Sequence, residues 1–305
     1  MESASFENSA NFSPVRKLLS QAARSLTAAG IESARLDAEV LLGHVLALTR
    51  EQLIVTHDLL ISAGQVQQFA TLLQRRLRRE PVAYITGRQE FWSRDFQVTP
   101  DVLIPRSETE RLIEVALTLA ADLDANKSLR VLDIGTGSGA VAVSLAAELP
   151  FAEVVATDNS PTALAIAQKN AALNEVADRI AFLPGDWFAA LGGGTAFDLI
   201  VSNPPYIRRA EIATLEPEVS LWEPRDALDG GADGLDCYRR IAAEAWRFLT
   251  PEGALALEVG AAMGGQVCAL FTQAGPYHEV SLFLDYAGRD RVVVAKIEAN
   301  SVGSI

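Results

Sequence analysis

From residue 129 onward, short apolar runs of strand length alternate with segments of helix length, and this alternation constrains the fold most strongly. Strands are predicted at 129–134, 152–158, 178–184, 197–202, 253–259, 278–284 and 291–297. Helices are predicted at 138–149, 161–173, 235–249 and 262–274. The pattern predicts an α/β fold with a mostly parallel seven-stranded sheet covered by helices on both faces. Because no helix separates the last two strands, at least one sheet edge is expected to be antiparallel.

The first hundred residues have a different pattern, which predicts separate parts of the chain. Residues 1–11 are polar and are expected to form a disordered tail, and 12–80 contain four helical patterns that predict a small helical domain. Ser62 and Gln65 are spaced as a capping box at the start of one of these helices. Residues 84–104 are expected to be extended, so that 81–104 form a hairpin linker before an α/β domain at 105–298. A second capping box, Ser107 to Glu110, is expected to open a helix that ends near Ala121.

Composition narrows the function classes. The 305 residues are 49% hydrophobic and 21% charged, and they contain no run of about 18 apolar residues that would span a membrane. The two cysteines lack the spacing of a metal site, and the polar start is unlike a signal peptide. We therefore expect a cytoplasmic protein that binds no metal and does not associate with membranes.

Charge is unevenly distributed along the chain. Residues 1–80 carry a net charge of +1 and residues 81–305 carry −14, which disfavours binding to nucleic-acid phosphates. The one basic cluster is Arg75-Arg76-Leu77-Arg78-Arg79, at the predicted end of a helix. Cations are favourable there against the helix dipole, so a solvated helix face is favoured over a binding patch for an acidic partner.

A glycine-rich turn follows the first strand of the alternating region: Gly135, Thr136, Gly137, Ser138 and Gly139. Glycines allow positive φ angles and let a ligand approach the backbone closely. Asp158 ends the next strand, a position from which an acid accepts hydrogen bonds from ribose hydroxyls. The spacing also satisfies the loose dinucleotide fingerprint, so a nicotinamide enzyme is the first alternative.

Three features favour S-adenosylmethionine over a dinucleotide. Asp133 lies inside the turn, where it suits a cationic ligand better than a pyrophosphate, and the glycine spacing suits a nucleoside with an amino-acid tail. The third feature is the corner described next, which has no role in hydride transfer. Asp186 and Trp187 end the third strand, where they are expected to bond the adenine amino group of S-adenosylmethionine and pack on its ring.

Asn203, Pro204, Pro205 and Tyr206 follow the fourth strand and form a stiff polar corner. Consecutive prolines fix φ and remove two N–H donors, which leaves the Asn203 side-chain oxygen and a backbone carbonyl as acceptors. Two acceptors beside an aromatic ring suit a planar –NH2 group. Asn-Pro is also a common turn starter, so the corner alone favours a binding role only modestly.

Together these motifs resemble the class I methyltransferases that modify planar amino groups. More narrowly, the chain is similar to the protein-(glutamine-N5) methyltransferases of the HemK/PrmC type, which act on peptide-chain release factors. The stretches that carry this resemblance are YITGRQEFW at 84–92, VLIPRSETE at 102–110, EPRDAL at 223–228, DGL at 233–235 and LEVG at 257–260. They cover nearly all of residues 80–295, and the helical domain also fits the family.

The resemblance implies a Rossmann-like catalytic domain at 105–298 and a substrate-recognition role for the helical domain at 12–80. It implies transfer of a methyl group from S-adenosylmethionine to the glutamine of the GGQ motif of release factors, in translation termination. Asn203, Pro204, Pro205 and Tyr206 would then be catalytic. The cofactor-binding residues would be Gly135, Thr136, Gly137, Ser138, Gly139, Asp158, Asp186, Trp187 and Asn203.

Other functions remain open from the sequence. A ribosomal-protein glutamine methyltransferase would use the same corner, and so would an adenine-N6 nucleic-acid methyltransferase, although the negative charge of residues 81–305 counts against direct DNA binding. A non-enzymatic cofactor-binding scaffold is disfavoured by the intact corner. The preferred release factor, the oligomeric state and the role of the long insertion at 207–234 are left open.

Overall fold

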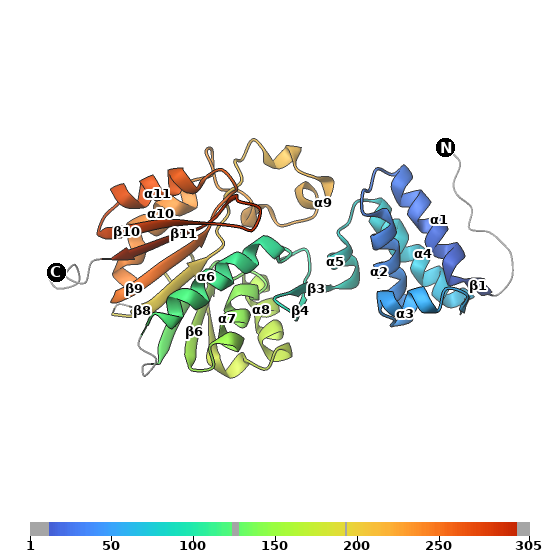
Figure 1. Ribbon diagram of the computed structural model, residues 1–305, viewed down its shortest axis with the longest axis horizontal. Helices are drawn as coiled ribbons and strands as arrows, with labels where there is room; N and C mark the ends of the chain where they lie inside the picture. Colours follow the sequence, from blue (N-terminus) through green and yellow to red (C-terminus); the bar gives the residue numbers. More distant parts are fainter. Residues whose placement is uncertain (1–11, 124–127, 193, 298–305) are drawn as a thin grey trace. The chain divides into compact units, whose positions relative to one another are not determined.

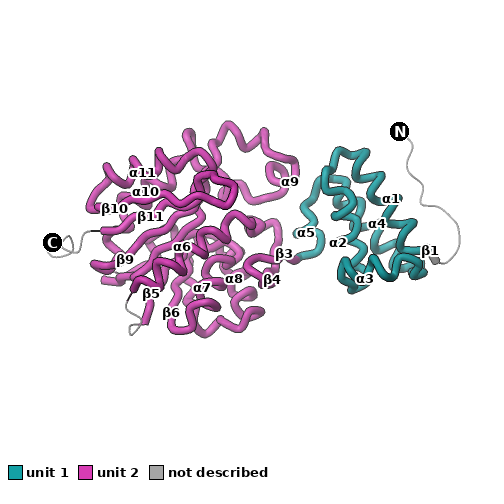
Figure 2. Tube along the Cα trace, in the orientation of Figure 1, with its two compact units in different colours: residues 1–87 teal, residues 88–305 magenta. Residues whose placement is uncertain are grey.

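The computed structural model describes residues 12–123, 128–192 and 194–297. The chain divides into two compact units with the boundary between Gly87 and Arg88 (Figure 2). The tail expected at 1–11 and the last residue of the expected catalytic domain lie outside the described residues.

The first unit is helical, as expected. Its elements are β1 (Phe12–Pro14), α1 (Val15–Ala28), α2 (Ala34–Leu46), α3 (Arg50–Val55), β2 (Leu60–Ser62), α4 (Ala63–Leu77) and α5 (Val82–Thr86). The predicted capping box at Ser62 and Gln65 is confirmed, because each residue bonds the backbone N–H of the other. Leu26, Leu41 and Leu73 lie in a continuous apolar core that this unit buries by itself.

Residues Val82–Thr86 form the helix α5, so the prediction of extended structure for 84–104 was wrong at 84–86. Pro81 caps this short helix, Gly87 ends it with a left-handed φ of 72°, and Tyr84 is buried within it. Val82 and Ile85 are β-branched and favour strands locally, but this strand propensity is weak. Burial of α5 against the rest of the first unit outweighs it.

The basic cluster at the end of α4 is mostly used inside the first unit. Arg76 is 5% exposed and forms an ion pair with Asp37 at 2.7 Å. Arg75 pairs with Glu80, and Arg79 donates to the Gly30 carbonyl at 3.0 Å. The prediction of a solvated basic face was therefore wrong for Arg76.

The second unit begins with the hairpin of β3 (Arg88–Phe91) and β4 (Arg94–Gln97), which pair antiparallel. Phe91 and Phe96 meet edge to face with ring centroids 6.0 Å apart, inside the core of this unit. The buried side chain of Asn170 bonds the backbone of Gln97 and also donates to the Ser138 carbonyl at 2.8 Å. The hairpin is thereby linked to the glycine-rich turn.

A seven-stranded sheet with helices on both faces forms the body of the second unit (Figure 1). Its strands, in spatial order, are β10 (Tyr277–Leu284), β11 (Asp290–Ile297), β9 (Leu249–Glu258), β8 (Phe197–Ser202), β5 (Leu129–Ile134), β6 (Ala152–Asp158) and β7 (Ile180–Pro184). The five strands from β9 to β7 are parallel to one another, whereas β11 pairs antiparallel with both of its neighbours, β9 and β10, as predicted for one edge. The main helices are α6 (Glu110–Ala121), α7 (Ala140–Glu148), α8 (Pro161–Leu173), α10 (Asp236–Glu244) and α11 (Gly264–Gln273).

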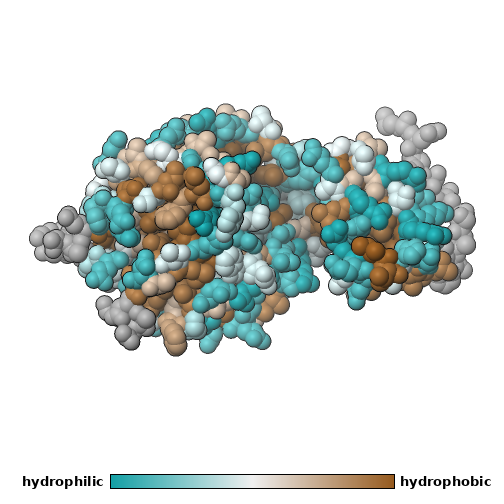
Figure 3. Space-filling view, viewed as in Figure 1, coloured by the Kyte–Doolittle hydropathy of each residue, from teal (hydrophilic) through white to brown (hydrophobic). Residues whose placement is uncertain are grey.

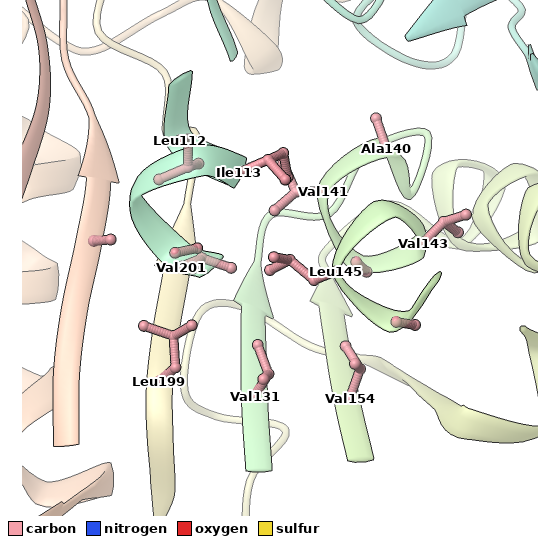
Figure 4. Packing of buried hydrophobic residues seen from close by; sticks show 14 of the residues in the cluster. Leu112, Ile113, Val131, Ala140, Val141, Val143, Leu145, Val154, Leu199 and Val201 are labelled. Carbon is pink, nitrogen blue, oxygen red and sulfur yellow. The ribbon is translucent and has the colours of Figure 1, made fainter. Parts of the chain in front are cut away.

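Alternating residues of the strands divide the core into two layers. Val131 of β5 packs with α6 and α7 on one face (Figure 4), and its neighbour Leu132 packs with α10 and α11 on the other. Side chains of a strand point alternately to opposite faces, so a sheet buried on both sides needs continuous apolar runs. This requirement explains why the strands were recognisable in the sequence.

The order of the strands places a topological switch between β5 and β8. The chain runs from β5 outward to β6 and β7, then returns to β8 on the other side of β5. Connections therefore leave the carboxyl ends of β5 and β8 in opposite directions, which opens a crevice where sheets of this type bind ligands.

Candidate active site

A cavity of about 250 Å³ lies at this switch point. The turn after β5 and the corner after β8 line it, together with residues that follow β6 and β7. Residues from the 101–109 segment and from the insertion complete the wall, among them Arg106, Thr109, Pro224 and Asp226. The cavity thus joins the two motifs that the sequence singled out.

The glycine-rich turn needs its glycines for conformation and for space. Gly135, Gly137 and Gly139 have φ angles of 69°, 55° and 81°, which L-residues with a Cβ rarely adopt. A Cβ on Gly139 would also lie 3.0 Å from the Cβ of Ala167 on α8. Gly135 and Gly137 have no such neighbour, so their missing side chains leave the backbone open toward the cavity.

Asp133 lines the cavity and supports the turn from beneath, while its expected contact with a cationic ligand stays a prediction. It is 1% exposed, and its Oδ2 accepts hydrogen bonds from the Thr136 hydroxyl at 2.6 Å and the Ala142 amide at 3.2 Å. Burial raises the pKa of this carboxyl to about 7, and those two hydrogen bonds oppose the rise. Asp133 therefore orders the turn and the start of α7.

Asp158 connects the second strand to the same turn. Its Oδ2 accepts from the Gly137 amide at 2.8 Å, and its Oδ1 accepts from the Ser160 amide at 2.9 Å. A carboxylate oxygen has more than one lone pair, so these bonds leave capacity for ribose hydroxyls. That contact with ribose stays a prediction.

Asp186 and Trp187 lie together at the end of β7 and line the cavity. Trp187 has a left-handed φ of 56°, and the Arg240 guanidinium lies 5.7 Å from the centre of its ring. Arg240 Nη1 also bonds Asp186 Oδ2 at 2.7 Å. The Asp186 carboxylate is therefore already paired by α10, and its expected bond to an adenine amino group stays a prediction.

Asn203 and Pro204 present two acceptors at the cavity wall. Asn203 Nδ2 donates to the Thr109 hydroxyl oxygen at 3.1 Å. Neither Asn203 Oδ1 nor the Pro204 carbonyl accepts a hydrogen bond from another residue in the part of the chain that the structure describes. Ser202 ties the corner to β5 by donating to the Ile134 carbonyl at 2.7 Å.

Tyr206 lies beside the cavity but is not among the residues that line it. Its ring packs with the core layer on the α10 and α11 side, and its hydroxyl donates to Glu258 Oε1 at 3.3 Å. The insertion packs closely around it, because a Cβ on Gly230 would lie 2.7 Å from the Tyr206 Cα. Stacking of Tyr206 on a target amide stays a prediction.

The sequence did not assign a role to four polar residues at the site: Arg106, Thr109, Glu223 and Glu258. Arg106 forms an ion pair with the buried Glu223, which also accepts a bond from the Ile104 amide at 3.3 Å. This pair connects the insertion to the loop before α6. All four residues lie in stretches that carried the family resemblance, and that was the available signal.

The predicted capping box at Ser107 was wrong. Residues Ser107–Thr109 form a 3₁₀ turn, η1, without a side-chain cap, and the Glu110 carboxylate instead accepts from the Trp92 amide at 2.9 Å. The turn places Thr109 under the corner.

Among the residues that the structure describes, no group of three His, Cys, Asp or Glu side chains is arranged to hold a metal ion, and no helix has the length and apolar character to cross a membrane.

The family models and the relatives that this chain matches all point to methyltransferases. Residues 17–87 match the family model "PrmC N-terminal domain", and 112–216 match "Methyltransferase small domain". A release factor glutamine methyltransferase from Moorella thermoacetica is 46% identical over 92% of this chain and 98% of its own length. The protein of the same name from Cereibacter sphaeroides is 47% identical over 90% of this chain and 95% of its own length.

Solved structures agree on the fold. The catalytic domain of hMettl16, in a complex with a hairpin of the MAT2A 3′ UTR, matches 78% of this chain and 84% of its own with a TM-score of 0.53. The identity is 15%, so this likeness concerns the α/β methyltransferase fold alone.

Proposed function

The chain belongs to the release factor glutamine methyltransferase family, and on that premise we propose that it methylates the side-chain nitrogen of the glutamine in the GGQ motif of a peptide-chain release factor. The methyl donor in this proposal is S-adenosylmethionine. The observation that carries the proposal is a pair of open acceptors, Asn203 Oδ1 and the Pro204 carbonyl, in one cavity with the glycine-rich turn. A substrate of the translation machinery implies a cytoplasmic enzyme.

The residues around the cavity fit S-adenosylmethionine. Gly135 and Gly137 leave the backbone open to an amino-acid tail, Asp158 has acceptor capacity for ribose, and Trp187 offers an aromatic face. When bound, this cofactor supplies a methyl group on a sulfonium.

The chain's own contribution is orientation and electrostatics. A glutamine amide nitrogen is a weak nucleophile because its lone pair is delocalised into the carbonyl. Asn203 Oδ1 and the Pro204 carbonyl would each accept a hydrogen bond from one N–H of the target amide and would stabilise its nitrogen as it gains positive charge and becomes tetrahedral. Holding the amide in line with the methyl group would provide further acceleration, and the methylated nitrogen would then lose its extra proton to solvent, so no nucleophilic side chain is needed.

Methyl transfer from labelled S-adenosylmethionine tests the proposal. Purified release factor, a ribosomal protein with an exposed glutamine, and DNA are compared side by side, with a release factor whose GGQ glutamine is replaced by alanine as the matched control. We expect label on the intact release factor and none on the control. Preferential labelling of the ribosomal protein or of DNA would replace the proposal with the corresponding alternative.

The identity of the cofactor has its own test. Calorimetry is expected to detect binding of S-adenosylhomocysteine and not of NAD. Tight NAD binding would support the dinucleotide alternative instead.

We also propose that the helical unit recognises the release factor. The arginines of α4 are largely paired within the unit, so they do not support this role. The feature that supports recognition of a protein partner is a set of exposed apolar side chains near α3 and β2: Ile54, Val55, Leu59 and Leu60. Figure 3 shows hydrophobic residues at the surface of this unit. An exposed apolar group of this kind suits a protein partner better than a nucleic acid.

Removal of residues 12–80 tests this role, since every residue that lines the cavity lies in the second unit. Affinity for S-adenosylhomocysteine should persist and the KM for release factor should rise. Unchanged turnover on full-length release factor would contradict the role.

A further inference from the structure

Arg106 is the only cation among the described residues that line the cavity. Five aspartates line the same cavity: Asp101, Asp133, Asp158, Asp186 and Asp226. An acidic cavity suits a cationic ligand, so a single arginine within it calls for an anionic group on that ligand. The reaction proposed at Asn203 and Pro204 gives this arginine no task.

Arg106 is held from one side and keeps donors for a ligand. Its Nη2 forms an ion pair with Glu223, a residue of the insertion whose side chain is 1% exposed. Glu223 also accepts a hydrogen bond from the Ile104 amide at 3.3 Å, which fixes the carboxylate. A guanidinium has five N–H donors in a planar fork. Because the Arg106 side chain is 37% exposed and lines the cavity, its remaining donors are available to a ligand there.

The 3₁₀ turn η1 places Arg106 near the corner. Arg106 immediately precedes this turn, and its carbonyl accepts a hydrogen bond from the Thr109 amide at 3.1 Å. The Thr109 hydroxyl contacts Asn203, and all three residues line the same cavity. Arg106 therefore lies at the end of the cavity where methyl transfer is proposed.

We infer that Arg106 receives the carboxylate of the amino-acid tail of S-adenosylmethionine. This inference rests on the proposed function and deepens its cofactor assignment. The tail has an ammonium and a carboxylate, and a short carbon chain connects both to the sulfonium. The five aspartates of the cavity would repel that carboxylate unless a cation paired with it. A guanidinium pairs with a carboxylate through two parallel hydrogen bonds, which suits Arg106 to this task.

The target glutamine suits this arginine less well than the cofactor does. The glutamine side chain and the two glycines of the GGQ motif carry no negative charge. A hydrogen bond from Arg106 to a carbonyl of the target would use its donors but would leave the cofactor carboxylate without a cation, which is costly inside a cavity. Pairing with the carboxylate uses both the charge and the planar fork of Arg106.

Calorimetry with two ligands tests the inference without methyl transfer. S-adenosylhomocysteine has the tail carboxylate, whereas 5′-deoxy-5′-(3-aminopropylthio)adenosine lacks only that group. Arg106→Met should weaken binding of S-adenosylhomocysteine about tenfold or more, as expected for loss of a charge-assisted pair. Its affinity for the decarboxylated ligand should change by less than about twofold, because that ligand has no partner for Arg106. Arg106→Lys keeps a cation and should recover part of the loss.

Arg209→Met is the matched control. Arg209 lies in the insertion, pairs with Asp229 at 2.9 Å and does not line the cavity, so both ligands should bind this variant as they bind the unchanged protein. Arg106→Met leaves Glu223 buried without its cation, which destabilises the fold. The double variant Arg106→Met/Glu223→Gln removes that charge and should show the same selective loss for S-adenosylhomocysteine.

The outcomes separate this inference from the proposed function. An equal loss for both ligands, or no loss for either, would overturn the inference. A raised KM for release factor with unchanged affinity for S-adenosylhomocysteine would place Arg106 on the target instead. If the selective loss is found but release factor is not labelled, the proposed target is wrong and the role of Arg106 stands. If the unchanged protein does not bind S-adenosylhomocysteine, both proposals fail.

Discussion

The turn after β5 and the corner after β8 lie side by side in one sheet but are constructed differently. In the turn, the side chains of Asp133 and Asp158 accept hydrogen bonds from the loop itself, so its polar groups are largely paired before any ligand binds. In the corner, Asn203 is held through its nitrogen and its oxygen stays open, as does the Pro204 carbonyl. The difference indicates that the turn provides a rigid surface and the corner provides directed acceptors.

Each region also has a buried carboxyl behind it. Burial raises the pKa of both Asp133 and Glu258 to about 7. One oxygen of Asp133 accepts two hydrogen bonds from residues of the turn and of α7. In Glu258, by contrast, Oε2 has no hydrogen-bond partner among the described residues. Asp133 is therefore assigned to folding of the turn. The predictions below separate the part played by the turn from that played by the corner.

The largest expected effect concerns Asp133 in the turn, which should make the free energy of unfolding depend on pH. The pKa of Asp133 rises from 3.8 to about 7 on folding, so the folded state binds the proton more tightly and loses stability as pH rises from about 4 to 7. At about 1.4 kcal/mol per pKa unit, the change in unfolding free energy amounts to a few kcal/mol. Denaturant unfolding of Asp133→Asn from pH 4 to 8 should show a flatter profile than the unchanged protein. An identical slope in both proteins would show that Asp133 titrates normally.

Asn203→Ala should have the next largest effect, and it acts on the reaction. Loss of an acceptor from a preorganised site typically costs ~3 kcal/mol, so turnover should fall on the order of a hundredfold. Asn203→Asp keeps an acceptor and should retain some activity, which makes it the matched control. Near-normal turnover of Asn203→Ala would mean that the corner is only a chain turn.

Two glycines of the turn give a smaller and purely structural contrast. Alanine at Gly137 meets only the strain of a positive φ, roughly 1–2 kcal/mol. Alanine at Gly139 adds a close contact with Ala167, which costs about 1–3 kcal/mol more. Urea unfolding should therefore rank Gly139→Ala as the less stable variant. Equal stabilities would show that α8 moves to accept the extra methyl group.

Arg240→Ala should have the smallest effect. Its guanidinium lies over Trp187 and pairs with Asp186, both at the surface of the expected adenine site. A partly exposed cation–π contact is worth about 0.5–1 kcal/mol, so affinity for S-adenosylhomocysteine should fall only a few-fold with kcat unchanged. A larger loss of kcat than of affinity would place Arg240 in the reaction itself.

The sheet could be predicted because its strands are buried on both faces. Apolar runs such as residues 199–201 within β8 (Phe197–Ser202) are typical of buried strands, and all seven strands were found near their predicted positions. The short α5 was missed because its helical state depends on packing, which local propensity does not report.

The site was predicted in part for similar reasons. Asn203, Gly135 and Asp158 are adjacent to recognisable strand ends, so their approach follows from parallel-sheet geometry. Thr109 and Asn203 come from segments 94 residues apart and meet through a 3₁₀ turn and the corner after β8. Neither residue type nor spacing indicates such a contact before the fold is known.

The central claim is that the turn binds the cofactor and the corner acts on the target amide. It is tested most directly by the affinity of Asn203→Ala for S-adenosylhomocysteine, measured by calorimetry beside the unchanged protein. If the corner acts on the target amide, the dissociation constant should stay within about threefold while turnover falls on the order of a hundredfold. A dissociation constant that weakens in proportion to turnover would contradict the account, because the corner would then act through the cofactor site.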